Sequence, residues 1–445
     1  MSSELAPTTT DDRIGLLDTT RGIAVLGILM MNITGFGLPY AYDDPTVWGL
    51  ESSADLVVWR IMALFFEGTM RGLFTLLFGA SALLFLARHA ARASDLRPAD
   101  LYFRRTLWLM VFGLINGYVL LWSGDVLLYY GVAGLLLFVF RNLPPRQLLL
   151  LATAFMVLQT MITVSEWNDY REVQMLAEAA TERRSAGQPM TDGDQEALDA
   201  FEALQNEMRP ARENLESSVG NVRASYLSAF AVLSGDTWYM QSQFFFRHGL
   251  VECLGMMLLG MALLKLGVLS GASSTRVYLA MVVIGYGLGL SVNIAEVRQV
   301  EAAQFSAEVM LHTFITYDLG RIPMTLGHLG SIALLYRTRW FASASRVLGA
   351  VGQMALTNYL TQSLLCLLIF TGAGLAWYGQ LARHELYYVV IAIWIVQLAW
   401  SPLWLRQFRY GPAEWLWRSL TYLKWQPLRR SSAAARVTAP VQKST

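Results

Sequence analysis

Charged residues and cysteines are scarce in this chain of 445 residues. Only 15% of its residues are charged, whereas soluble proteins average about 25%. Its two cysteines, Cys253 and Cys366, lie inside apolar runs, which excludes a disulfide framework and zinc-type cysteine spacing. The net charge of +1 argues against nucleic-acid binding. The chain also lacks a Gly-rich phosphate loop, a Gly-x-Ser-x-Gly elbow and a His-Glu-x-x-His helix, so we predict no metal site.

Apolar residues are abundant instead. They make up 55% of the chain, and the mean hydropathy is +0.40. The apolar runs are longer than the short alternating segments of a β-barrel, so they predict an all-α, polytopic transmembrane helical bundle of about ten spans. The runs cover residues 22–38, 72–87, 106–121, 126–140, 148–164, 249–268, 277–292, 322–336, 354–370 and 386–400.

Arginine and lysine fall in alternate connections between these runs. With ten spans, Arg104, Arg105 and the basic residues after residue 408 share one side, while Glu51 and Asp55 lie on the other. The positive-inside rule then predicts a multi-pass protein of the bacterial inner (plasma) membrane, with both termini in the cytoplasm. The predicted partners are the lipid bilayer and a small-molecule substrate, and the oligomeric state stays open.

Composition divides the chain into six parts. A long polar connection with thirteen carboxylates separates two groups of five spans, and a Trp-rich segment too short to cross a membrane follows the last span. The predicted parts are a disordered tail (1–12), the first span group (13–164), an extracytoplasmic helical insertion (165–225), the second span group (226–408), a cytoplasmic interfacial amphipathic segment (409–430) and a disordered tail (431–445).

The first span carries polar residues along one stripe. Arg21 lies about 60° around the helix from Asp18, and Asn32 returns to within about 40° of both. Asn32 is also about 16 Å deeper than Arg21, close to the middle of a bilayer. Such groups are costly in lipid, so this stripe is predicted to face a protein interior or a wet cavity.

Two further charged pairs have the i,i+4 spacing that places side chains on one helical face. Glu67 and Arg71 are predicted to pair, either lining a cavity or tethering two helices. His248 and Glu252 are predicted to pair at the outer end of the sixth span. The carboxylate would raise the basicity of the imidazole, as a general base requires, or the pair would be only a hydrogen bond at the membrane interface.

Polar groups also recur in the eighth and ninth spans. Asp318, Arg321 and His328 share a face and predict either an anion site in the bundle or an internal salt bridge. Asn358 and Gln362 share a face of the ninth span, where amides are most often hydrogen-bonded between helices.

Four stretches resemble the YeiB-like family of bacterial inner-membrane proteins, which has no established activity. They are Leu17–Asn32, Glu67–Gly79, Gly352–Ser363 and Gly411–Tyr422. The resemblance spans nearly the whole chain and implies a shared fold rather than a known reaction.

The first span has a wider similarity. Its Leu-Asp-x-x-Arg-Gly sequence, with Asn32 ten residues beyond Gly22, is similar to the opening helix of heparan-α-glucosaminide acetyltransferase and the membrane acyltransferases grouped with it. This resemblance implies transfer of an acyl group from cytoplasmic acyl-CoA to an extracytoplasmic or membrane acceptor. Asn32 would orient the acyl carbonyl. Residues 33–58 contain no histidine, so His248 with Glu252, or else His312, would supply the base.

Two other functions stay open. The Glu67–Arg71 and Asp318–Arg321 pairs would suit a transporter or permease for a small anionic or zwitterionic solute. A non-enzymatic membrane protein that docks partners on the acidic 165–225 insertion is the third hypothesis.

Overall fold

The computed structural model describes residues 14–40, 45–91 and 96–430, and the predicted tails 1–12 and 431–445 lie outside this range. Among the residues described, the only β pairing is one isolated bridge between Phe408 and Arg429. All other regular structure is helical, as predicted. The helices are α1 (Gly15–Gly37), α2 (Ser53–Phe65), α3 (Thr69–Ala90), α4 (Arg97–Tyr118), α5 (Leu127–Phe140), α6 (Pro145–Ser185), α7 (Asp192–Met208), α8 (Arg212–Ala224), α9 (Tyr226–Tyr239), η2 (Met240–Gly249), α10 (Leu250–Lys265), α11 (Thr275–Ala302), α12 (Ala307–Thr313), α13 (Tyr317–Tyr336), α14 (Ala342–Gln353), α15 (Ala355–Phe370), α16 (Leu386–Gln407) and α17 (Pro412–Tyr422).

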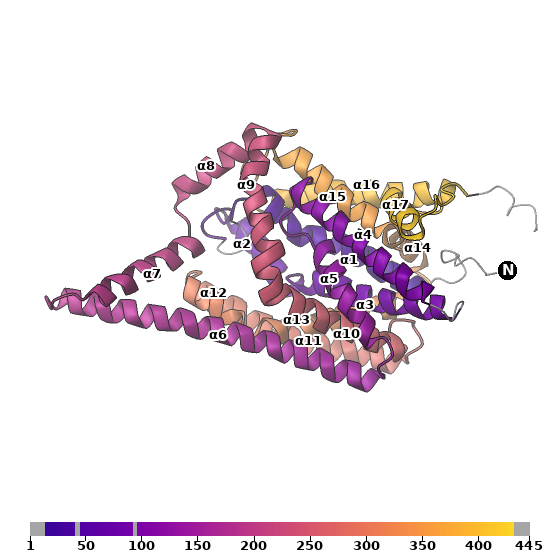
Figure 1. The fold of residues 1–445 in the computed structure, drawn as a ribbon, viewed down its shortest axis with the longest axis horizontal. Helices are drawn as coiled ribbons and strands as arrows, with labels where there is room; N and C mark the ends of the chain where they lie inside the picture. The colour runs from indigo at the N-terminus through magenta and orange to yellow at the C-terminus, as the bar shows by residue number, and fades with distance from the viewer. Residues whose placement is uncertain (1–13, 41–44, 92–95, 431–445) are drawn as a thin grey trace, which may run out of the picture.

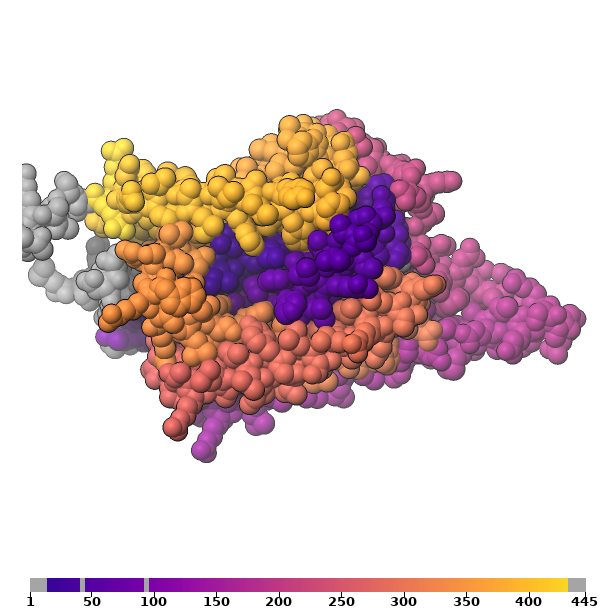
Figure 2. Space-filling view, turned by 180° about the vertical axis from the view of Figure 1, so that it is seen from behind, coloured from indigo at the N-terminus to yellow at the C-terminus, as the bar shows by residue number. Residues whose placement is uncertain are grey.

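The long helices form a bundle with two distinct ends (Figure 1). We call the end at which α1 begins and α17 lies the terminal end, and the opposite end, from which α6 and α7 project, the far end. The earliest helices are recessed between the later ones when the molecule is seen from behind (Figure 2). Most of the first span is buried in the bundle, and of its polar stripe Asp18 is buried whereas Arg21 and Asn32 are partly exposed.

Each of the ten predicted apolar runs lies on a helix, apart from a few terminal residues. Among the described residues, six stretches are long and apolar enough to cross a membrane, or seven if the bent pair α14–α15 counts as one. The predicted all-α bundle with several helices able to cross a membrane is therefore confirmed, while the number of ten spans stays a prediction.

Two glycines allow α1 to contact α14 closely. A Cβ atom on Gly22 would lie 2.0 Å from the Leu348 carbonyl oxygen, and one on Gly352 would lie 1.9 Å from the Asp18 carbonyl oxygen. Only glycine permits backbones to approach at this distance. Gly22 of the Leu-Asp-x-x-Arg-Gly sequence thus has a packing role. The close contact that it allows places Asp18 and Arg21 beside the start of α15.

The polar insertion begins within helix α6, which continues from the fifth predicted span without a break. Helix α6 runs without a break for 41 residues, from Pro145 through the predicted boundary at residue 165 to Ser185. The chain then turns, and α7 packs back along α6 (Figure 1). Thr191 and Asp194 form a capping box at this turn, and Asp194 also pairs with Arg183. The Thr191 backbone N–H, followed by its hydroxyl, holds the pKa of Asp194 below its usual value.

Three of the stretches that are long and apolar enough to cross a membrane depart from regular α-helix. Helices α2 and α3 are separated by Phe66–Gly68, where Gly68 is left-handed at φ +65°. A π-helix, η2, precedes α10, and α14 meets α15 at a 76° bend. Interruptions of this kind in membrane helices concentrate at functional sites, because they expose backbone groups and re-aim side chains.

Candidate functional site

A basic cavity opens at the terminal end. Its volume is about 210 Å³, and α1, α3, α4, α5, α14, α15 and α17 contribute to its wall. Four arginines line it, together with the carboxylates Asp18 and Glu414 and the buried His89. The arginines are Arg21, Arg88, Arg105 and Arg418.

Packing and hydrogen bonds hold two of these arginines in place. The guanidinium of Arg21 donates to the carboxylate of Asp18 and to the hydroxyl of Ser81, each at 2.9 Å. The guanidinium of Arg105 lies 4.9 Å from the ring centre of Phe85 and 4.1 Å from that of Trp417. Such stacking fixes the guanidinium plane and leaves its N–H groups free to bind an anion.

Positive charge in the cavity is only partly neutralised. Arg21 has Asp18 as its ion-pair partner, but within the described residues neither Arg105 nor Arg418 has a carboxylate partner. Arg105 also lies within electrostatic range of Arg418 and Arg21. Because like charges repel in a partly enclosed site, an anion bound between these arginines would relieve the repulsion.

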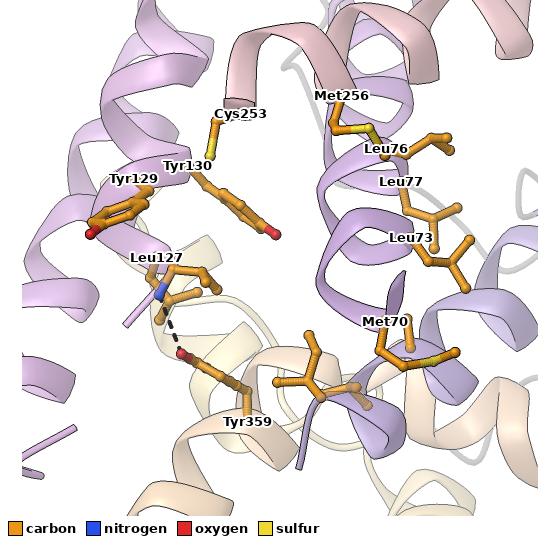
Figure 3. Close-up of a cluster of buried hydrophobic side chains, with 14 of the residues drawn as sticks. Met70, Leu73, Leu76, Leu77, Leu127, Tyr129, Tyr130, Cys253, Met256 and Tyr359 are labelled. Atoms are coloured by element: carbon orange, nitrogen blue, oxygen red, sulfur yellow. Dashed lines mark hydrogen bonds between the residues drawn. The ribbon is translucent and has the colours of Figure 1, made fainter. Parts of the chain in front are cut away.

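The inner end of the cavity is apolar and aromatic. Phe74, Tyr130 and Tyr359 line it, and the Tyr130 hydroxyl lies 2.6 Å from that of Thr75. Figure 3 shows the Tyr359 hydroxyl directed toward the start of α5, where it accepts a 3.3 Å hydrogen bond from the Val126 backbone. A cavity that is basic at its mouth and apolar inside suits an amphipathic anion.

Helix α17 closes one side of this cavity. The Glu414 carboxylate accepts hydrogen bonds from the backbone N–H groups of Leu356 (2.7 Å) and Thr357 (3.1 Å), which caps the start of α15. The indole of Trp417 donates to the Arg105 carbonyl at 2.8 Å. The segment predicted to lie at the membrane interface thus packs against the bundle and supplies Arg418. Sequence reasoning missed Arg418 and Glu414 as site residues, and their only signal was the mixed charge of this Trp-rich segment.

A second polar cluster lies where α3, α10 and α13 meet. The carboxylate of Glu252 pairs with Arg321 at 2.7 Å and with Arg71 at 3.3 Å, and Arg321 also pairs with Asp318 at 2.5 Å. The side chain of Arg321 is 2% exposed. The predicted Asp318–Arg321 pair therefore forms, but inside a larger cluster. Arg71 is three residues from Phe74, about 4.5 Å along α3 from the inner end of the basic cavity.

The predicted Glu67–Arg71 pair is not formed. Arg71 pairs with Glu252 instead, and Glu67 makes no salt bridge among the described residues. The physical reason is the interruption at Gly68, which ends one helix before the next begins at Thr69. The i,i+4 rule holds only within a continuous helix, so it does not apply across this break.

The predicted His248–Glu252 pair is also wrong. The ring Nε2 of His248 lies 2.9 Å from the Glu166 carboxylate and its Nδ1 lies 3.0 Å from the Gln159 amide, both on α6. The π-helical winding of η2 ends at Gly249 and changes the register between His248 and Glu252. Two arginines then attract Glu252 to the cluster. Glu166, rather than Glu252, is the carboxylate that contacts this histidine.

The remaining predicted residues lie outside the basic cavity. His328 donates to or accepts from Tyr286 and contacts the Phe65 carbonyl at 2.8 Å. Asn293, which was not predicted from the sequence, donates to the neighbouring Leu64 carbonyl at 2.9 Å. These side chains satisfy carbonyls that the end of α2 leaves open. His312 on α12 packs on Trp167.

The amides of the first and ninth spans also lie away from the cavity lining. The Asn358 side chain donates to Val351 and Ser401 at 3.1 Å, and that of Gln362 donates to Val25 and Gln397. Both are buried and connect α15 to its neighbours. Asn32 is half-buried and makes no side-chain hydrogen bond among the described residues.

Comparison with known proteins assigns this chain to a family whose members have no described activity. The model of the family described as "Protein of unknown function (DUF418)" matches residues 263–424. No solved structure matches the chain.

The family assignment rests on two relatives that match nearly the whole chain. The uncharacterized protein YxaH of Bacillus subtilis is 30% identical over 444 residues, which cover 97% of this chain and 99% of YxaH. The uncharacterized protein YeiB of Escherichia coli is 30% identical over 413 residues, which cover 91% of this chain and 95% of YeiB. Identity at this level along both chains confirms the resemblance predicted from the sequence. The chain therefore belongs to the YeiB-like family of membrane proteins.

Proposed function

We propose that the basic cavity binds an acyl-CoA as the donor in an acyl-transfer reaction. The observation that carries this proposal is the pair Arg105 and Arg418, which lack carboxylate partners and line a cavity with an aromatic inner wall. Guanidinium groups bind phosphate oxygens in a forked geometry. The similarity of the first span to membrane acyltransferases supports the same donor.

The size of the cavity determines which part of the donor enters. At about 210 Å³ it is smaller than the roughly 300–1,000 Å³ of pockets that enclose drug-sized ligands. The acyl and thioester end would therefore occupy the apolar interior, and the phosphates would stay at the arginines. With the terminal end in the cytoplasm, as the positive-inside rule predicts, the donor would arrive from inside the cell.

The roles predicted for His248 and Asn32 in the transfer step remain proposals. His248 and Asn32 do not line the cavity, so an acceptor and its base would reach the thioester from the far end, past Arg71 and Phe74. The acceptor would attack the acyl carbonyl, the thioester C–S bond would break, and the thiol of CoA would leave with the proton released by the acceptor.

Donor binding is testable with purified protein in nanodiscs. We expect acetyl-CoA, whose acyl group is small enough for the cavity, to bind, as measured by calorimetry, and a variant carrying Arg105→Ala and Arg418→Ala to bind at least about 100-fold more weakly. This follows because each hydrogen bond to a charged group contributes about 1.5–3 kcal/mol. Arg60→Ala is the control, because Arg60 pairs with Glu301 away from the cavity. Equal affinity in the double variant, or no binding by the unaltered protein, would refute the proposal.

A transporter is the second candidate. Interrupted spans beside buried charges are the arrangement that secondary transporters use for substrate and ion binding, and the α2–α3 break next to Arg71 and Arg321 has this form. Uptake of a small zwitterion into proteoliposomes without any dependence on CoA would favour this function over acyl transfer.

A further inference from the structure

The basic cavity follows one face of α3. Phe74, Phe78, Ser81 and Phe85 line it at spacings of four, three and four residues, which place their side chains on one side of the helix. The arginine-lined mouth is near Phe85, whose ring Arg105 contacts, and the inner end is at Phe74. The depth of the cavity can therefore be measured along this helix.

An aromatic wall closes the inner end. The ring of Tyr130 extends from α5 toward α3 (Figure 3), where its centre lies 5.9 Å from that of Phe74 and 5.1 Å from that of Phe78. The Tyr130 hydroxyl lies 2.6 Å from that of Thr75, which donates its own proton to the Arg71 carbonyl at 2.8 Å. Tyr130 is therefore the donor in this pair, and the wall is held by a hydrogen bond as well as by packing.

The region behind this wall is charged. Arg71 is three residues beyond Phe74 on α3 and pairs with Glu252 at 3.3 Å, and Arg321 contacts the same carboxylate. An apolar chain that passed the wall would separate charged groups that are already paired, and it would offer them no hydrogen bond in exchange. Both the size and the polarity of this region therefore stop an acyl chain at Phe74.

The distance from the arginines to the wall limits the length of a donor. Phe85 and Phe74 are eleven residues apart on α3, which corresponds to about 16.5 Å at 1.5 Å per residue. The pantetheine arm of CoA has twelve bonds between its phosphate oxygen and its sulfur, and these span about 14 Å at roughly 1.2 Å per bond of extended chain. With the phosphates at the level of Arg105, about 2.5 Å remains beyond the sulfur, which is the length of two bonds.

We propose that Phe74 and Tyr130 limit the acyl group of the donor to two or three carbons. This inference rests on the proposed binding of acyl-CoA and adds the residues that select among donors. The thioester carbonyl then lies at the level of Phe74, on the side from which the acceptor is proposed to arrive. A longer acyl chain would occupy the path of the acceptor as well as collide with the wall.

The experiment compares CoA, acetyl-CoA and octanoyl-CoA by calorimetry with the full chain in nanodiscs, and empty nanodiscs correct for partitioning into lipid. We expect octanoyl-CoA to bind at least tenfold more weakly than acetyl-CoA, because its six further carbons would have to displace Phe74 and Tyr130. Phe74→Ala should reduce this ratio to less than threefold. Phe74→Trp should shift the affinity ratio of acetyl-CoA to CoA at least threefold toward CoA, since the larger ring fills the space of the acetyl group.

The control and the probes separate the possible outcomes. Phe246→Ala removes an exposed phenylalanine of η2 outside the cavity and should leave the selectivity unchanged. Binding of CoA by each variant shows that it is folded, and Phe74→Trp decides the matter if Phe74→Ala does not fold.

Failure of the donor proposal and failure of this inference are distinguishable. If neither CoA nor acetyl-CoA binds, the donor proposal is refuted, and this inference with it. If both bind and depend on Arg105 and Arg418, but octanoyl-CoA binds as tightly as acetyl-CoA or the Phe74 variants leave the ratios unchanged, only the inference about chain length is overturned.

Discussion

Replacing Gly22 by alanine should weaken the packing between α1 and α14. The added Cβ would lie 2.0 Å from the Leu348 carbonyl oxygen, and ordinary contacts begin at 3.4 Å, so the backbones must separate by 3.4 − 2.0 = 1.4 Å. The obstructing atoms belong to the backbone and cannot rotate away. Overpacking of this kind costs about 1–3 kcal/mol of unfolding free energy.

A matched glycine provides the control for this prediction. Gly287 lies inside helix α11, and a Cβ there would meet nothing within 4 Å. Gly287→Ala should therefore stabilise the protein by about 0.5–1 kcal/mol, through helix propensity alone. Heating both variants in detergent and following tryptophan fluorescence and size exclusion should place Gly22→Ala below the unaltered protein and Gly287→Ala at or above it. If Gly22→Ala were as stable as Gly287→Ala, the close contact of α1 with α14 would be wrong.

Two further predictions concern polar groups outside the basic cavity. Asn293→Ala should lower the unfolding free energy by about 1–3 kcal/mol, because the Leu64 carbonyl at the end of α2 loses its 2.9 Å hydrogen bond, whereas Ser291→Ala on the exposed face of α11 should change thermal stability little. The pKa of Asp194 is held low by the Thr191 backbone N–H, so the contribution of Asp194 to stability is present above its ordinary pKa of 3.8 and is lost as the pH falls through its folded value. The protection factors for hydrogen exchange in residues 186–194, which correct for the intrinsic pH dependence of exchange, should therefore fall on acidification in the unaltered chain but not in Asp194→Asn, and equal pH dependence in both would contradict this.

The secondary structure and the family could be predicted from the sequence. Each apolar run became a helix because a backbone in lipid must satisfy its own hydrogen bonds, and a helix does so within one segment. The Asp18–Arg21 spacing likewise predicted that both charges lie on one stripe of the first helix, and in the structure they form an ion pair at 2.9 Å. These features depend on neighbours within one turn, which the sequence lists directly.

Only the tertiary structure decided which charges meet. Glu252 pairs with Arg71 and Arg321, which are far from it in sequence, and Arg418 joins Arg105 across the cavity because α17 packs on α4. The spacing rules failed at Glu67 and His248 because both assume unbroken α-helix, and a left-handed Gly68 and a π-helix change the register there. Such interruptions persist because partners from other helices, such as Asn293 and His328, satisfy the freed carbonyls. Local periodicity therefore determined the helices and the inward-facing stripe of this protein, while long-range packing determined both of its polar sites.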